Sequence, residues 1–165
     1  MRPFLAALRQ ALPPPVTALS GTVLWGALMG FNALVFFWRL EWPTGPRVVT
    51  LTAIFALGGA LAFPLGHTLQ ALLVRNTRSE TRFAAAFIAF TLATLGFTAA
   101  IYAIQYRAYY AQWHGSFLSP EWAIQFVFTT AGALYQFAVL GLRVYFPWGL
   151  AALFALSLAY AVKAR

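Results

Sequence analysis

Long apolar runs separated by short polar stretches dominate the chain. The runs cover residues 16–38, 48–74, 83–105, 121–142 and 147–162. The first four are as long as the ~20 residues that a helix needs to cross a hydrocarbon core of about 30 Å. The pattern therefore predicts an all-α, polytopic transmembrane helical bundle that forms a single domain over residues 1–165.

The last third of the chain leaves the number of spans open. Residues 121–165 are apolar almost throughout, and an unbroken helix of that length would measure about 65 Å, roughly twice the hydrocarbon core. Arg143 and Pro147 mark a break near residues 142–148, so we expect 121–142 and 147–162 to form a hairpin. This interpretation gives five spans. The alternative is four, with one of the last two segments lying flat on the membrane. Ser119, followed by Pro120, is expected to cap the helix that begins the fourth run.

The first 15 residues have a different pattern. Apolar and polar side chains fall on opposite faces of a short helix, which three consecutive prolines end at residues 13–15. The apolar face holds Phe4, Leu5, Leu8 and Leu12, and the polar face holds Arg2, Arg9 and Gln10. Such a segment is typical of an interfacial amphipathic helix that lies on the membrane surface.

Composition agrees with a membrane environment and excludes several kinds of chemistry. The chain is 62% hydrophobic and 8% charged, whereas soluble domains contain about 25% charged residues. It has no cysteine, which excludes disulfides, thiolate metal sites and cysteine nucleophiles. The net charge is +8, but the basic residues lie between the apolar runs. We therefore interpret them as anchors for lipid phosphates, above all Arg75, Arg78 and Arg82, and expect no nucleic-acid partner.

The basic residues also predict an orientation. With five spans, the ends of the chain face opposite sides of the membrane. One side then carries Arg2, Arg9, Arg75, Arg78, Arg82 and Arg143, and the other carries Arg39, Arg47, Arg107, Lys163 and Arg165. Because cytoplasmic loops are enriched in Lys and Arg, this small excess favours a cytoplasmic N-terminus and an outer C-terminus, for example in a bacterial inner membrane.

Small residues at four-residue spacing predict where helices pack closely. The first span carries Gly26 and Gly30, and the second carries Gly58, Ala62 and Gly66. Such stripes let backbones approach each other in lipid, where no hydrophobic force drives helices together. Since a short loop joins these two spans, we expect them to pack on each other. The alternative is that one stripe faces a second copy or another subunit.

Polar side chains inside the spans are the candidate ligand-binding residues, because burying them in lipid is costly. They are His67 and Gln70 in the second span, Thr94 and Thr98 in the third, and Gln125 and Gln136 in the fourth. Together they would line a polar seam between these three spans. The alternative is that the threonines bond to their own helices and the glutamines pair across helices as structural contacts. Arg107 and His114, in an aromatic-rich outer segment, are further candidates for contact with a lipid headgroup, a quinone headgroup or a partner. The alternative is that this segment is only an aromatic belt with anchoring residues.

Neither a metal nor another cofactor is expected. His67 and His114 lie near opposite ends of the bundle, about 30 Å apart, so they cannot share one ion. No catalytic set is evident either. An enzyme would require Arg107, His114 and Glu121 to converge at the outer face.

The sequence thus favours a non-enzymatic role. The first hypothesis is a small accessory or scaffold subunit that packs in the membrane against a larger complex or against itself. The second is a small transporter or a lipid- or quinone-binding protein that uses the polar seam. The expected partners are membrane lipids and either another membrane protein or a second copy of the chain.

Overall fold

The computed structural model describes residues 2–41, 45–74 and 78–162, and within these ranges every regular element is helical. The elements are α1 (Arg2–Ala11), α2 (Pro15–Arg39), α3 (Pro46–Leu73), α4 (Ser79–Tyr110), the 3-10 turn η1 (Ala111–Trp113), α5 (Pro120–Gln136), the π-helix η2 (Phe137–Gly141), α6 (Leu142–Val144) and α7 (Trp148–Val162). The predicted all-α fold is confirmed.

Four continuous helical segments are long and apolar enough to cross a membrane, and α7 is a shorter apolar helix. The four segments are Pro15–Arg39, Pro46–Leu73, Ser79–Trp113 and Pro120–Val144. Each begins or ends near a proline or a charged residue. Ser119 caps α5 as predicted, because its hydroxyl accepts the backbone N–H of Trp122 at 3.1 Å. The chain is therefore an integral membrane protein by the length and hydropathy of its helices.

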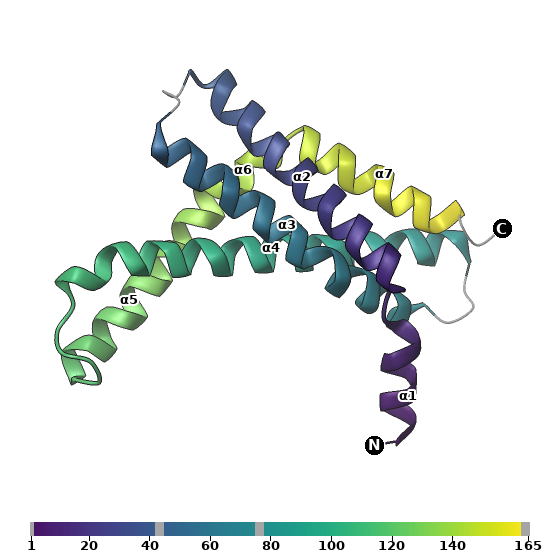
Figure 1. Ribbon diagram of the computed structural model, residues 1–165, viewed down its shortest axis with the longest axis horizontal. Helices are drawn as coiled ribbons and strands as arrows, with labels where there is room; N and C mark the ends of the chain where they lie inside the picture. Colours follow the sequence, from purple (N-terminus) through teal and green to yellow (C-terminus); the bar gives the residue numbers. More distant parts are fainter. Residues whose placement is uncertain (1, 42–44, 75–77, 163–165) are drawn as a thin grey trace.

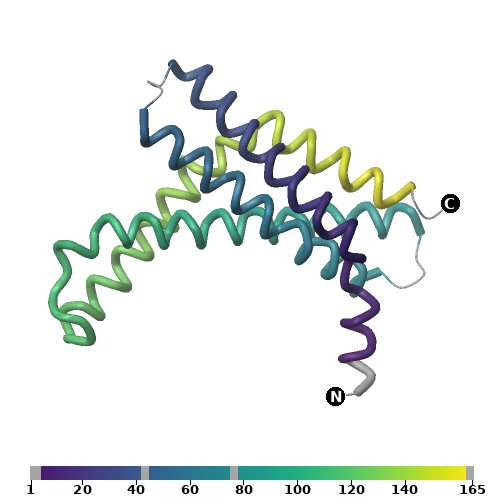
Figure 2. Tube along the Cα trace, in the orientation of Figure 1, coloured from purple at the N-terminus to yellow at the C-terminus, as the bar shows by residue number. Residues whose placement is uncertain are grey.

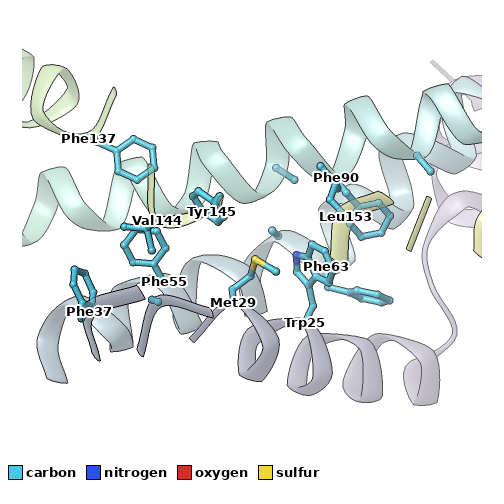
Figure 3. Close-up of a cluster of buried hydrophobic side chains, with 14 of the residues drawn as sticks. Trp25, Met29, Phe37, Phe55, Phe63, Phe90, Phe137, Val144, Tyr145 and Leu153 are labelled. Carbon is cyan, nitrogen blue, oxygen red and sulfur yellow. The ribbon is translucent and has the colours of Figure 1, made fainter. Parts of the chain in front are cut away.

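α2, α3 and α7 run in a similar direction, and the long α4 crosses them (Figure 1). α3 packs between α2 and α4, and α7 packs on α4 and touches α2. The same path is seen in the Cα trace of Figure 2, where the second half of α4 extends away from the bundle with α5. The bundle encloses an aromatic core that includes Trp25, Met29, Phe55, Phe63 and Phe90 (Figure 3).

The small residues lie where helices meet, and they serve two different contacts. A Cβ on Gly26 would lie 2.9 Å from the Ala56 carbonyl oxygen, and one on Gly30 would lie 2.8 Å from the Ala56 Cβ, so the first stripe faces α3. The second stripe faces α4 instead of α2. A Cβ on Gly58 would lie 2.8 Å from the Thr98 Cα, and one on Gly66 would lie 2.7 Å from the Phe90 ring.

The remaining member of the second stripe, Ala62, is fully buried. The side of α3 that meets α2 is formed by Ala56, Gly59 and Ala60. α2 and α3 are therefore neighbours, as expected, but the stripe on α3 serves the next helix.

The last two helices do not form the expected hairpin. α5 and α7 both pack against α4, and neither packs extensively against the other. The Tyr145 hydroxyl lies 2.8 Å from the Thr98 hydroxyl of α4, and near the end of α7 the Tyr160 hydroxyl lies 2.6 Å from His67 Nδ1, close to the end of α3. The path from α5 to α7 is thus one bent passage along α4.

This path changes the predicted placement of the ends. The start of α2, the end of α3 and the end of α7 lie at one end of the bundle (Figure 1). The described ends of the chain therefore lie toward the same end of the bundle, whereas the five-span interpretation places the two chain ends on opposite sides; the side of the membrane that each end faces stays a prediction. The five-span interpretation assumed that the chain reverses its direction at Pro147. In the structure the corner at Tyr145–Pro147 bends the chain, and α7 continues along α4.

α1 is a separate short helix that bends sharply away from α2 and contacts α3 (Figure 1). Ala11 is buried, whereas Arg9 and Gln10 are exposed. Of the predicted apolar face, Leu8 is half-buried, whereas Leu5 and Leu12 are exposed. Its predicted position on the membrane surface stays a prediction.

Candidate functional site

The two threonines of the predicted seam belong to a buried hydrogen-bond network between helices. Trp25 Nε1 of α2 donates to the Thr94 hydroxyl at 3.0 Å, and the Tyr145 hydroxyl donates to the Thr98 hydroxyl at 2.8 Å. Thr98 in turn donates to the Thr94 carbonyl at 2.8 Å. Every one of these polar groups is satisfied by a protein partner, so the network fastens α2, α4 and the corner before α7 together.

The two glutamines of α5 lie in two other places. Gln125 accepts the backbone N–H of Gly115 at 2.8 Å and thereby holds the loop before α5. Gln136 accepts from the Tyr102 hydroxyl at 3.0 Å and donates to the Tyr106 hydroxyl at 3.3 Å. Gln136 therefore joins α5 to α4.

His67 and Gln70 lie near the opposite end of the bundle. His67 is half-buried and pairs with Tyr160, and Gln70 is buried within α3. The six candidate residues of the seam therefore form separate groups: Thr94 with Thr98 at the centre, Gln136 and Gln125 toward the far end of α4, and His67 with Gln70 near the end of α3. The structure does not bring them together around one cavity.

The outer segment is an aromatic belt around Arg107. Its guanidinium lies 3.6 Å above the ring of Phe126 in α5, a cation–π contact. The rings of Tyr106, Tyr109, Tyr110 and Trp113 meet in tilted or edge-to-face contacts, with ring centroids from 4.6 to 5.7 Å apart. Such rings suit the membrane–water interface, where an apolar body and a polar tip are both accommodated.

The convergence that an enzyme would require is not seen. Arg107 rests on Phe126, and it makes no ion pair with Glu121; nor does His114. His114 follows η1, where its backbone N–H bonds to the Ala111 carbonyl. Since no hydrogen bond or ion pair joins these three side chains in the described ranges, the enzyme hypothesis that rested on them gains no support and stays a prediction.

Two of the three predicted phosphate anchors are described. Arg78 precedes α4 and is exposed, and Arg82 lies in the first turns of α4 and is half-buried. Arg75 lies outside the described residues. Within residues 2–41, 45–74 and 78–162, no three His, Asp or Glu side chains gather into a group that could hold a metal ion.

Three features escaped the sequence interpretation. Asn32 is buried in α2, where its amide donates to the Val144 carbonyl at 2.8 Å. Arg143, interpreted as part of a break and as one of the basic residues that set the orientation, lines a cavity together with Tyr102. The sequence interpretation also did not predict that the segment containing α5 is mostly exposed. A polar residue inside an apolar span, as at Asn32, is the signal that could have pointed to the first of these.

A comparison with known protein families, curated proteins and solved structures finds no match to this chain.

Proposed function

We propose that this protein is a membrane-embedded assembly subunit that packs against another transmembrane helix through α5. The observation that carries the proposal is the burial of the four long segments. In the most apolar stretch of each, 39% of the residues are buried for the first three, but only 11% for Pro120–Val144. α5 packs on α4 alone among the long helices.

The positions of the glycines also favour the exposed face of α5 as the docking surface. Gly26, Gly30, Gly58, Gly59 and Gly66 each lie against a neighbouring helix so closely that a Cβ would collide with it. Of the helical glycines in the described ranges, only Gly96 and Gly132 have open space around them, one on α4 and one on α5. The open space over Gly132 leaves room for a further helix to approach α5 closely.

A tyrosine on the same face needs a partner that the chain does not provide. Tyr135 is 70% exposed in the second half of α5, and its hydroxyl has no hydrogen bond within the described part of the chain. Phe128, Ala131, Gly132 and Tyr135 follow the i, i+3, i+4, i+7 spacing of one helix face. A helix that packs over Gly132 and accepts the Tyr135 hydroxyl would complete this face.

Site-specific photo-cross-linking tests the proposal. The cross-linking amino acid p-benzoylphenylalanine replaces Tyr135 or, in a second variant, Phe128, and membranes are irradiated before solubilisation. We expect a protein–protein adduct at both positions. The matched control places the same group at Val23, which is 59% exposed on α2 and faces away from the bundle; there we expect lipid adducts only.

Mass spectrometry of the adducts identifies the occupant as a second copy or as a different membrane protein, and either supports the proposal. Lipid adducts alone at positions 128 and 135 would show that this face of α5 is simply lipid-exposed, and the proposal would then fail.

A further inference from the structure

A cavity of about 230 Å³ lies near the far end of the bundle, where α2 and α3 approach η2. Its wall is mostly apolar and is formed by Phe36, Phe37, Leu51, Phe55, Phe137 and Leu140. Pockets for whole drug-sized ligands measure about 300–1,000 Å³. This cavity therefore suits a stretch of acyl chain better than an entire amphiphile.

The π-helix shapes one wall of the cavity. The backbone N–H of Leu142 bonds to the Phe137 carbonyl five residues earlier, so this turn holds an extra residue. Phe137 thereby packs against Phe55, with ring centroids 6.4 Å apart, while Gly141 and Arg143 remain on the cavity wall. π turns inside helices are frequent at functional sites, because they displace side chains from regular helical positions.

Arg143 is a cation on the wall of this largely apolar cavity. It lies two residues before Tyr145, whose hydroxyl reaches Thr98, and Thr98 in turn packs on Gly58 near the middle of α3. The carbonyl of the next residue, Val144, accepts from the Asn32 amide of α2, so the Arg143 backbone lies beside α2. From there the cavity reaches Leu40 at the end of α2.

No carboxylate in the described part of the chain forms an ion pair with this arginine, which is exposed. The protein has only three acidic residues, and Glu41, Glu80 and Glu121 all belong to other segments. An arginine within an apolar layer is costly unless it faces a cavity and meets an anion.

We propose that this cavity holds an acyl chain of an anionic phospholipid whose phosphate pairs with Arg143. The planar guanidinium binds phosphate oxygens in pairs, and its long stem lets the charged group extend toward the headgroup level. Tyr102 and Gln136 provide polar groups on the same wall. The site is independent of the α5 docking face, because Tyr135 and Gly132 do not line it.

Native mass spectrometry of the full chain tests the headgroup contact. The probes are phosphatidylglycerol and phosphatidylcholine with identical acyl chains. We expect tighter binding of phosphatidylglycerol, and we expect Arg143→Gln to weaken that binding at least about tenfold and to abolish the preference. The matched control is Arg47→Gln, which removes an exposed arginine outside the cavity from the first turn of α3 and should leave the affinity unchanged.

A second pair of variants tests the acyl-chain contact. Leu140→Trp should fill the cavity and weaken phosphatidylglycerol binding, whereas Leu134→Trp, on the same helix but outside the cavity, should not. Circular dichroism establishes that each variant keeps its helices. Equal affinity for the two lipids in the unmodified chain, unchanged binding by folded Arg143→Gln, or unchanged binding by folded Leu140→Trp would each overturn the proposal.

Discussion

Single glycines show that helix association in this chain depends on close contact between neighbouring helices. In lipid, two apolar helices gain little by leaving the solvent, so association depends on packing and hydrogen bonds. Gly58 meets the backbone of Thr98, and Gly26 and Gly30 meet Ala56 on the other side of α3. A side chain at any of these positions would separate helices that also hold buried hydrogen bonds.

We expect Gly58→Ala and Gly96→Ala to have opposite effects on stability. At Gly58 a Cβ would lie 2.8 Å from the Thr98 Cα, and forcing α3 and α4 apart should cost about 1–3 kcal/mol. At Gly96 nothing lies within 4 Å, so alanine should be neutral or stabilise the helix by up to about 1 kcal/mol.

Reversible unfolding of the two variants in detergent–lipid mixtures measures this difference. A Gly58→Ala protein as stable as the unmodified chain would contradict the contact between α3 and α4.

At the scale of elements, the corner between α6 and α7 is the least predictable feature. Pro147 has no N–H to donate, and the Leu150 N–H bonds to Tyr145 instead of Phe146. The Val144 carbonyl is satisfied by the Asn32 amide from α2, 112 residues away in sequence. A helix–helix contact therefore stabilises the break.

Asn32→Leu should loosen this corner selectively. Leucine has the same branched outline, although it is larger, and it cannot donate a hydrogen bond, so the buried Val144 carbonyl would lose its partner. Intramembrane hydrogen bonds contribute about 0.6 kcal/mol on average and at most about 1.7 kcal/mol.

We expect a stability loss of that size, together with faster amide hydrogen exchange around residues 144–150 than in α3. The control is Ser20→Ala, since the Ser20 hydroxyl bonds only within α2. Equal exchange at the corner in the variant and the unmodified protein would show that Asn32 does not hold it.

For the whole molecule, the bent path from α5 to α7 gives a different distribution of basic residues between the two ends of the bundle than the five-span interpretation does. Since α7 returns to the end where α2 begins, the described segments at that end carry Arg2, Arg9, Arg78 and Arg82. In the sequence, Arg75 follows α3, and Lys163 and Arg165 follow α7. The opposite end carries Arg39, Arg47 and Arg107, and Arg143 lies between. We propose that both termini are cytoplasmic, because this asymmetry is larger than the one that five spans would give.

Single-cysteine labelling tests the topology directly, because the natural chain has no cysteine. Arg9→Cys, Glu80→Cys and a cysteine added after residue 165 should react with a membrane-impermeant maleimide only from the cytoplasmic side. Glu41→Cys and Gln112→Cys should react only from the other side. If the added C-terminal cysteine were labelled from the same side as Glu41→Cys, the two chain ends would face opposite sides of the membrane. That result would support the five-span interpretation instead.

The sequence by itself determined that this chain is helical and that its apolar runs belong in a membrane. Both properties are local: each residue contributes hydropathy, and each helix satisfies its own backbone hydrogen bonds. The cap at Ser119 and the small-residue positions Gly26 and Gly58 were also visible for this reason.

Only the tertiary structure decided which neighbour each helix face meets. Hydropathy cannot distinguish a side chain that faces lipid from one that faces another apolar helix, so Gly58 gave no sign that it faces α4 instead of α2. The path from α5 to α7 depends on Asn32 with Val144 and on Thr98 with Tyr145, contacts between residues 112 and 47 positions apart. The same long-range contacts separate the polar residues into groups and leave the cavity beside Arg143.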